Sequence, residues 1–510
     1  MMLKKTIALA TATVMVTSLL AACGSKEEAG SAPDETTPLE IRIFTRQQAP
    51  EATAPDNLIL KELEKLTNTK MDIIWVPVNT LQEKTKVTIA GGDIPDVMYI
   101  NDPFDPLFVQ SAREGAFWDL TPYIKDYPLL KAFPEGAWKN SQIDGKNFGV
   151  PRPRPEEGGG DFPLIRKDWL DKLGLPVPKT ADDYYKVAKA FAHNDPDGNN
   201  QADTQGIIAN VSPDGMGSFG WVEVLHTGIS TGTWTLKDGK LSLTQFDPGI
   251  KKSLEFMKKL YDEKIIPADF AVIKNSQVRD AFMANKAGIM PGAVNLSWLT
   301  LSTLMKVVPS ADVIAVDYLQ GPQGPVISKT TGLFGMFAIP KSVPEAKMKR
   351  VLGFLEKTVD VEIANVAKYG LKDVHYTREG KDPLFVTSTE KAKADNIADT
   401  GNNLSQIFSI YDKYFYAYYT GIPTDKYERN KKVIDERTKV SVAPLPSGMI
   451  SETWTMVGAD LNKKIQDLKI KIIMGKEPLS AWDSYVESLK SNADVIKATE
   501  EMNAEYKKVK

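Results

Sequence analysis

Residues 193–206 (HNDPDGNNQADTQG) carry an oxygen-bearing side chain at every second position of one short stretch. The alternating residues are Asp195, Asp197, Asn199, Gln201 and Asp203. Calcium takes about six to eight oxygen ligands, which carboxylates, an amide and the Gln201 backbone carbonyl can supply at this spacing. The pattern departs from an EF-hand, because Asn200 and Gly206 stand where the turn glycine and the bidentate glutamate belong. A solvated turn that caps the preceding helix is the alternative interpretation.

The sequence before this stretch predicts the helix that positions it. Thr180, with Asp183 three positions later, is typical of a capping box in which Asp replaces the usual Glu or Gln. Apolar residues then follow at helical spacing: Tyr184, Val187, Ala188 and Phe191. A calcium ion at the end of this helix would hold a scaffold, because no neighbouring residue offers an open site with a general base.

Residue patterns for metal-dependent catalysis are sparse. The histidines of the chain are His193, His226 and His375, and they form no metal-binding pair such as HExxH. A glycosidase needs only two carboxylates, so a saccharide-active enzyme stays open as an alternative. The sequence favours a binding protein and assigns no catalytic residue.

The composition is that of a soluble globular protein with a mildly acidic body. The chain has 510 residues, of which 42% are hydrophobic and 25% charged, and this is enough for two or more cores. Its formal net charge is −3, whereas a nucleic-acid-binding protein carries a basic patch or stripe. We therefore expect no nucleic-acid partner.

The first residues have the features of a secretion signal. Lys4 and Lys5 precede an apolar segment, residues 6–20, that is too short for a membrane span of about 20 residues. The single cysteine, Cys23, follows the run LAA, which resembles the lipobox of bacterial lipoproteins. That resemblance implies that residues 1–22 are removed as a signal peptide and that Cys23 is lipidated, for example with palmitate. An ordinary secretory signal beside an incidental cysteine is the alternative.

Residues 23–37 contain no large apolar side chain. Such a segment cannot bury enough surface to offset the entropy of ordering it, so we expect a disordered tether after the lipidated cysteine. The body would then lie outside the cytoplasm, anchored to the bacterial cell membrane by the lipid alone.

The start of the body alternates between strand and helix patterns. Leu39, Ile41 and Ile43 alternate as in a strand, and a helix with Asn57 as N-cap is expected next. Two further strand patterns, MDIIWVPV and VMYI, follow on either side of another helix-compatible segment. This order favours an α/β fold with mainly parallel strands.

Four segments in order carry a family resemblance: IAGGDIPDVMYI, RDAFMANKAGIMPGAVNLSW, GMFAIPKSVPEAKMKRVLGFLEKTV and KIIMGKEPLSAWDSYVESLK. Behind a lipobox, they resemble the extracellular solute-binding lipoproteins of ABC importers, family 1, oligosaccharide-type subgroup. The resemblance implies a two-lobed periplasmic-binding-protein-like fold with a hinge and an interlobe ligand cleft. We place lobe one at 38–153 plus 312–385, and lobe two at 154–311 plus 386–510.

Sugar sites pair flat aromatic rings with a few fixed polar groups. On that basis the candidate ligand-binding residues are Trp298, Arg152, Arg154, Trp221 and Trp234. The two arginines stand between prolines just before the expected crossover, and the resemblance places Trp298 in the region that faces the cleft. Each tryptophan has the alternative of a core position, and the aromatic run 411–421 is expected to form a buried helix face.

The resemblance implies a monomeric receptor that captures an oligosaccharide by hinge closure and delivers it to the membrane subunits of an ABC importer. Two arginines would favour an acidic saccharide. A receptor for a non-sugar solute such as a peptide is the main alternative. The resemblance also implies a calcium loop in the second lobe of some members, in which an acidic ligand commonly follows the last aspartate; here Thr204 stands at that position.

Overall fold

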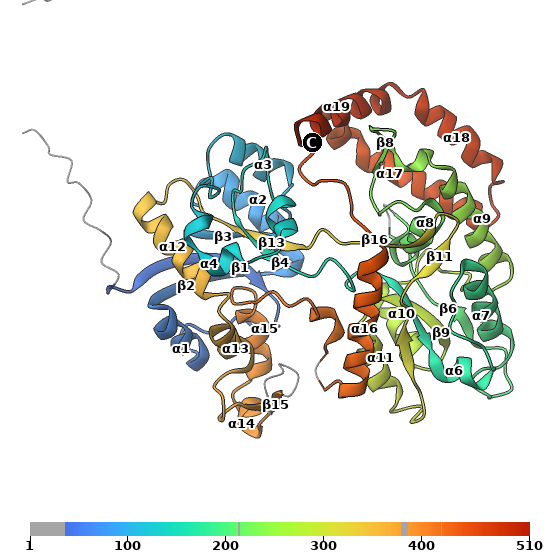
Figure 1. The fold of residues 1–510 in the computed structure, drawn as a ribbon, viewed down its shortest axis with the longest axis horizontal. Coiled ribbons are helices and arrows are strands. Elements are labelled where there is room, and N and C mark those ends of the chain that lie inside the picture. Colours follow the sequence, from blue (N-terminus) through green and yellow to red (C-terminus); the bar gives the residue numbers. More distant parts are fainter. Residues whose placement is uncertain (1–35, 213–214, 379–385, 420, 510) are drawn as a thin grey trace, which may run out of the picture. The chain divides into compact units, whose positions relative to one another are not determined.

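The computed structural model describes residues 36–509 apart from 213–214, 379–385 and 420 (Figure 1). Residues 38–510 form one compact unit. The expected signal peptide, Cys23 and nearly all of the expected tether lie outside the described residues. No helix within the described ranges is long and apolar enough to cross a membrane.

A five-stranded sheet forms the centre of what we call the first lobe, whose buried side chains make one hydrophobic core. The strand order is β2 (Thr69–Pro77), β1 (Leu39–Gln47), β3 (Val97–Ile100), β13 (Leu333–Ala338) and β4 (Val150–Pro153). Strand β1 runs parallel to β2 and β3, whereas β13 runs antiparallel to β3 and β4. Every residue of β3 is buried, as expected for a central strand covered on both faces.

Helices from two distant parts of the chain pack on this sheet (Figure 1). The first group comprises α1 (Leu58–Thr67), α2 (Leu81–Gly91), α3 (Pro106–Arg113), α4 (Pro128–Lys131) and α5 (Glu135–Lys139). The second comprises α12 (Glu345–Lys357), α13 (Val361–Tyr369), α14 (Glu390–Ala394) and α15 (Ile397–Leu404). A hairpin of β14 (Tyr376–Arg378) and β15 (Val386–Ser388) lies between α13 and α14 in the chain.

The second lobe is built on a four-stranded sheet with two hydrophobic clusters. Its order is β10 (Val313–Ala315), β5 (Phe162–Arg166), β9 (Ala287–Gly292) and β6 (Gln205–Ile207). Smaller strands are β7 (Trp234–Lys237) paired with β8 (Lys240–Leu243), and β12 (Gly324–Ser328) between β11 (Leu319–Gly321) and β16 (Ser441–Val442).

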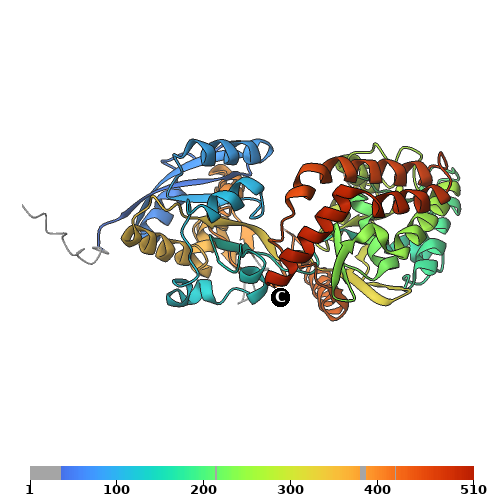
Figure 2. The ribbon, with the colours of Figure 1, turned by 90° about the horizontal axis from the view of Figure 1, so that it is seen from above.

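Ten helices surround these strands in the described part of the second lobe. They are α6 (Lys167–Lys172), α7 (Ala181–His193), α8 (Gly220–Thr227), α9 (Pro248–Asp262), α10 (Asn275–Met283), α11 (Leu296–Leu304), α16 (Thr424–Val440), α17 (Glu452–Ile473), α18 (Ser480–Lys490) and α19 (Ala493–Val509). The C-terminal helices α17 and α19 lie side by side in the dark red part of Figure 2, and α9 packs against α17.

Local sequence signals place several of these elements as predicted. The Asn57 side chain accepts hydrogen bonds from the backbone N–H groups of Ile59 and Leu60 and so caps α1. Thr180 and Asp183 form the predicted capping box at the start of α7. Both caps satisfy N–H groups that a helix leaves without partners at its first turn.

Three features differ from the sequence predictions. The sheets are mixed rather than mainly parallel, because β13 runs antiparallel to β3 and β4, and β5 runs antiparallel to β9 and β10. Strand β10 pairs with β5 in the second lobe, whereas a boundary at 312 would assign it to the first. Helices α14 and α15 bury Ala392, Ile397 and Leu404 in the core of the first lobe, whereas a boundary at 386 would assign them to the second.

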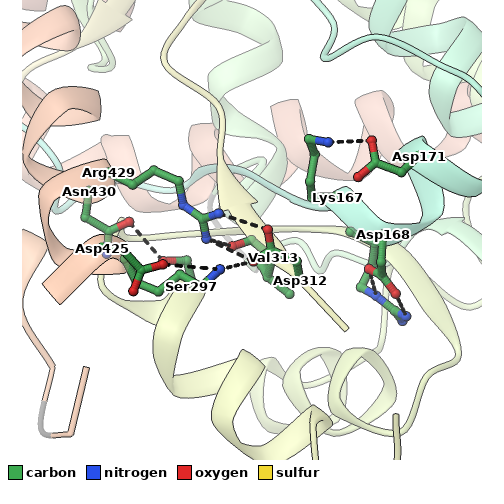
Figure 3. Close-up of polar contacts among 11 residues, drawn as sticks. Lys167, Asp168, Asp171, Ser297, Asp312, Val313, Asp425, Arg429 and Asn430 are labelled. Carbon is green, nitrogen blue, oxygen red and sulfur yellow. Dashed lines mark hydrogen bonds and ion pairs between the residues drawn. The ribbon is translucent and has the colours of Figure 1, made fainter. Parts of the chain in front are cut away.

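An ion-pair cluster fixes α16 to the end of β10. Figure 3 shows the Arg429 side chain directed at Asp312 and Val313, with hydrogen bonds of 2.9 and 3.1 Å to the Asp312 carboxylate and 2.6 Å to the Val313 carbonyl. Lys426 donates to the same carboxylate at 2.9 Å. The helix that follows the aromatic run 411–421 is thereby attached to the sheet of the second lobe.

Three chain segments connect the two lobes, and we call them the crossing segments. They are residues 154–161 between β4 and β5, 329–332 between β12 and β13, and 405–414 between α15 and the turn before α16. The first two are hydrogen-bonded to each other, since Thr330 N–H donates to the Glu156 carbonyl and Arg154 N–H to the Gly332 carbonyl, both at 2.8 Å.

Candidate functional site

Three guanidinium groups surround one phenylalanine ring beside the crossing segments. The central carbons of Arg46, Arg154 and Arg152 lie 4.7, 5.0 and 5.1 Å from the centre of the Phe334 ring. These distances are within the range of attraction between a cation and an aromatic face. We call Arg46, Arg152, Arg154 and Phe334 the arginine cluster.

A β-bulge in β13 presents Phe334 to the arginines. The pairing of β13 with β4 shifts register between Leu333 and Met336, which bends the strand and re-aims its side chains. Gly335 lies in the bulge with φ of +82°, and a Cβ there would come within 2.5 Å of the Ile100 carbonyl oxygen. The bulge thus depends on glycine, because other residues disfavour this φ and would also clash.

Arg152 lies in β4, and Arg154 directly follows the last residue of that strand. Because the Arg154 N–H still pairs with the Gly332 carbonyl beside β13, the two side chains leave the chain on the same face. Arg152 donates to the Ser405 carbonyl at 3.0 Å, and Arg154 donates to the Ser409 hydroxyl at 3.2 Å. Both partners belong to the third crossing segment. The prolines at 151, 153 and 155 fix φ along this stretch and so limit the positions that the two guanidinium groups can take.

The arginine cluster has an excess of donors over acceptors. Within the described residues none of its three arginines forms an ion pair with a carboxylate, and Arg46 Nε, Arg152 Nε and Arg152 Nη1 are buried without a hydrogen-bond partner. Arg152 is 4% exposed and Arg46 is 8% exposed. Buried charged donors without partners are costly, and an anion placed here would satisfy them.

The charges around the arginine cluster also favour an anionic ligand. Burial lowers the pKa of Arg152 to about 9, and the positive charge of Arg154 contributes to the decrease. Burial also lowers the pKa of Arg154. Lys368 on α13 is exposed over part of its side chain, but protein atoms surround its amino group. This local burial lowers the pKa of Lys368, and the positive charge of Arg154 lowers it further. Four cationic groups therefore act on one region.

The aromatic run 411–421 contacts the arginine cluster through Phe415. The prediction that this run forms a buried helix face is wrong. Its described residues form a loop with a short turn at Phe415–Ala417. Arg154 lies over the Phe415 ring at 4.5 Å. The Tyr416 ring lies so close to Gly159 in the first crossing segment that a Cβ there would approach its Cζ to 2.5 Å.

A cationic and aromatic cluster beside the crossing segments is thus present on an α/β scaffold. The sequence matches the family described as bacterial extracellular solute-binding protein over residues 48–347, more than half of the chain. The chain belongs to this family of solute-binding proteins. The family resemblance predicted from the four sequence segments is confirmed, and so is the prediction that the protein is not an enzyme, since the family binds and transports solutes.

Two relatives from Bacillus subtilis (strain 168) match this solute-binding protein over nearly its whole length. Lipoprotein LipO is 32% identical over 496 residues, 96% of each chain. The polygalacturonan/rhamnogalacturonan-binding protein YtcQ is 33% identical over 476 residues, covering 92% of this chain and 91% of YtcQ.

Solved structures share the fold. A human-milk-oligosaccharide-binding solute-binding protein from Bifidobacterium longum infantis superposes with a TM-score of 0.73 at 20% identity, covering 92% of this chain and 99% of that one. An EF-hand mutant of FusA from S. pneumoniae, solved with fructo-nystose, gives a TM-score of 0.65 at 21% identity, covering 91% and 98% of the two chains.

None of the three predicted tryptophans belongs to the arginine cluster. Trp221 is 6% exposed in α8 and packs edge-on against Phe162 and Tyr184, so its ring belongs to the core of the second lobe rather than to a loop. Trp234 begins β7 and meets Trp454 edge-on at 5.2 Å. Trp298 on α11 is partly buried against the third hydrophobic cluster.

In the 193–206 loop three of the predicted calcium ligands converge. The Asn199 amide nitrogen donates to the carboxylates of Asp197 at 2.9 Å and Asp203 at 3.2 Å. Asp195 instead accepts the backbone N–H groups of the loop itself, at 3.0 to 3.1 Å. The Gln201 backbone N–H donates to the side-chain amide oxygen of Asn199 at 2.7 Å. No group of three or more His, Cys, Asp or Glu suited to a metal occurs among the described residues.

Sequence patterns identified half of the arginine cluster. Arg152 and Arg154 were recognisable from the alternating prolines, whereas Arg46 and Phe334 belong to strands whose proximity only the folded sheet reveals. Gly335 was the available signal for Phe334, because a lone glycine inside a strand pattern suggests a bulge.

Proposed function

We propose that this solute-binding protein is a receptor for acidic oligosaccharides, which bind at the arginine cluster. The observation that carries the proposal is the set of three guanidinium groups around Phe334 without a carboxylate partner in the described residues. A guanidinium group forms paired, charge-assisted hydrogen bonds with a carboxylate such as that of a uronic acid. The rings of Phe334 and Phe415 supply the apolar surfaces that the C–H faces of sugars require.

The relatives support a saccharide ligand. YtcQ is described as binding polygalacturonan and rhamnogalacturonan, and both polymers contain galacturonate. A receptor that is 33% identical to YtcQ over 92% of its own length and carries a cationic site fits the same class of ligand. Peptide binding, the alternative from the sequence, is a direct outcome of the ligand test below.

Hinge closure is the mechanism we propose for capture. The cluster includes side chains held by the first and third crossing segments, so a bound ligand would contact the segments that link the lobes. A ligand that touches groups on both lobes stabilises the closed form by its differential affinity for the two forms. The membrane subunits of an ABC importer would then recognise the closed receptor and accept the saccharide. Small-angle scattering should detect compaction at saturating ligand, and unchanged scattering would rule out closure.

Isothermal titration with residues 24–510 tests the ligand class. The panel comprises galacturonate oligosaccharides, rhamnogalacturonan oligosaccharides, neutral fructo-oligosaccharides and mixed peptides. Acidic saccharides should bind most tightly and should be recovered intact. Preferential binding of peptides would replace the saccharide proposal, and recovery of cleaved saccharide would mean an enzyme.

Two accessory features complete the proposal. Cys23 would carry the lipid that anchors the receptor outside the cytoplasm, and Cys23→Ala should release it from the membrane into the medium.

A calcium ion in the 193–206 loop would bind Asp197, Asn199 and Asp203, together with the Gln201 backbone carbonyl. Asp195 would hold the loop backbone and complete the set if its carboxylate turned inward. Calcium there would stabilise the second lobe without contacting the ligand.

A further inference from the structure

A cavity of about 290 Å³ lies within the second lobe, between α8, the loop that follows it and one face of α17. It is distinct from the arginine cluster, since none of the cluster residues lines it. Among its lining residues are Glu223, Thr244, Gln245, Trp454, Gln466 and Lys469. Its volume is close to the lower end of ligand pockets, about 300 Å³.

Buried polar groups of this cavity have no partners in the described structure. Gln466 is 1% exposed, and neither its amide oxygen nor its amide nitrogen has a hydrogen-bond partner there. The same holds for the Thr244 hydroxyl and the Gln245 amide oxygen. Such atoms are rare in native proteins, because each costs the free energy of losing its water without replacement. Thr244 and Gln245 follow β8 and Gln466 lies on α17, so unpartnered polar groups from two elements line the cavity, which indicates a site built for a polar guest.

The charges of the cavity cancel. The side chain of Lys469 is 3% exposed and pairs with Glu223 at 2.5 Å. Glu223 also lies in the first turn of α8, where a negative charge opposes binding of a second anion at the helix N-terminus. A phosphate or carboxylate is therefore disfavoured here, although the residues 215–220 (GMGSFG) have the spacing of a phosphate-binding loop.

The remaining walls suit a sugar ring. Trp454 borders the cavity and is held by its edge-on contact with Trp234, while Ile465, Val224 and Leu243 add apolar surface. The amide of Gln466 offers two donors and an acceptor, and the hydroxyl of Thr244 offers one donor and an acceptor. Mixed donors and acceptors next to an aromatic ring match the hydroxyls and C–H groups of an uncharged sugar.

A hydrogen bond and an ion pair at the end of β12 link a cavity-lining residue to the first crossing segment. Ser230 lines the cavity and its hydroxyl lies 2.5 Å from that of Ser328. The next residue, Lys329, pairs with Glu156 at 2.8 Å, two positions after Arg154 in the first crossing segment.

We infer that this cavity binds one neutral sugar residue. The inference rests on the proposed function, because it adds a neutral subsite to a receptor that holds an acidic sugar elsewhere. The neutral residue is either a unit of the same oligosaccharide or a free monosaccharide.

The test compares affinities of the native receptor and two variants of the cavity, Gln466→Leu and Thr244→Val. Titrations use a tetrasaccharide that alternates galacturonate with rhamnose, a tetrasaccharide of galacturonate alone, and free rhamnose. Both variants should weaken binding of the alternating ligand about tenfold or more and change binding of the uniform ligand less than about threefold. Both should fold, since replacing an unpartnered buried polar group by an apolar one of similar shape is nearly neutral.

Thr85→Val is the matched control, because Thr85 in the first lobe also has a buried hydroxyl without a described partner. It should leave all affinities unchanged. An effect of Gln466→Leu on free rhamnose identifies the monosaccharide as the guest, and an effect on the alternating ligand alone identifies a unit of the chain.

The outcomes separate the two proposals. If both cavity variants bind the alternating ligand as tightly as the native receptor does, or weaken both tetrasaccharides equally, the cavity inference is overturned while the acidic-saccharide receptor stands. If the native receptor binds only neutral oligosaccharides, the acidic ligand class is wrong, and the variants are then compared on those ligands. If it binds no saccharide, both proposals fall. A crystal structure of the complex with only water in the cavity would also overturn the inference.

Discussion

Arg154 lies over the Phe415 ring at 4.5 Å, although one residue begins the first crossing segment and the other follows the third. The same guanidinium group lies 5.0 Å from the centre of the Phe334 ring in β13. Arg154 is thus held between two aromatic rings from separate parts of the chain. A ligand that binds Arg154 would therefore contact the connections on which lobe movement depends.

Arg154→Met should weaken binding of galacturonate oligosaccharides about 10- to 150-fold. A hydrogen bond to a charged group contributes about 1.5–3 kcal/mol, and each 1.4 kcal/mol changes affinity tenfold. Methionine keeps much of the packing between Phe334 and Phe415 and removes the charge. Isothermal titration measures the change, with Arg279→Met on α10 as a control of equal charge. Equal losses in the two variants would mean that only net charge matters.

Binding of an acidic saccharide should take up protons at about pH 9. Burial lowers the pKa of Arg152 to about 9, so about half of these side chains are neutral there in the free receptor. A bound carboxylate favours the charged form and raises this pKa, so the complex binds more protons and apparent affinity falls as the pH rises.

The proton uptake is measured by titrating the same ligand in two buffers of different ionisation enthalpy. The apparent binding enthalpies should differ at about pH 9 and agree at about pH 7, where Arg152 is charged in both states. Arg152→Gln should abolish the difference. Identical enthalpies in both buffers at the higher pH would show that the ligand does not interact with Arg152.

Local interactions were predictable from the sequence, and distant ones were not. The caps formed by Asn57 and Thr180 depend on residues two or three positions away, so the sequence revealed them. The tyrosines of the run 411–421 have helical spacing, but this segment contacts Gly159 and Arg154 and ends at Gly421 with φ of +76°. Tertiary contacts with a distant glycine-rich loop determine the conformation of the run. These contacts cannot be predicted from the residues of the run alone.

Gly159→Ala should destabilise the receptor by about 1–3 kcal/mol. The added Cβ would lie 2.5 Å from Tyr416 Cζ, so the ring must move or the crossing segment must shift. Gly160→Ala is the matched control, because nothing lies within 4 Å of a Cβ there, and it should change stability by less than about 0.5 kcal/mol.

Urea unfolding gives the free energies for Gly159→Ala, Tyr416→Ala and the double variant. Removing the ring makes room for the methyl group, so the double variant should be more stable than the sum of the single effects predicts. Strict additivity would exclude the contact between Gly159 and Tyr416 as the cause.

Calcium should raise the thermal unfolding temperature of the native receptor, and a chelator should reverse the increase. At about 100 times its dissociation constant a bound ion adds about 2.7 kcal/mol. Asp197→Asn should abolish the shift, because it removes a carboxylate directed at Asn199. Asp238→Asn in the exposed turn between β7 and β8 should retain it. An unfolding temperature that is the same with calcium and with chelator would leave the loop as a capping turn.

Asp312→Asn should destabilise the receptor at about pH 7 by roughly 1.5–3 kcal/mol and reduce its sensitivity to acid. Burial alone would raise the pKa of Asp312, but the hydrogen bonds from Arg429 and Lys426 outweigh it and lower the pKa below its usual value. The stabilisation is therefore present above the pKa of the unfolded chain and is lost as the pH falls through the lower pKa of the folded state.

Urea unfolding from about pH 7 to pH 3 measures this dependence. The native receptor should lose more stability over this range than Asp312→Asn does, because only the native carboxylate must be protonated against Arg429 and Lys426. Asp425→Asn is the matched control on the same helix, since Asp425 is 74% exposed and lies 4.0 Å from Lys426 (Figure 3). It should follow the native curve, because an exposed pair at this distance contributes little. Parallel curves for the native receptor and Asp312→Asn would mean that α16 is held to β10 by packing alone.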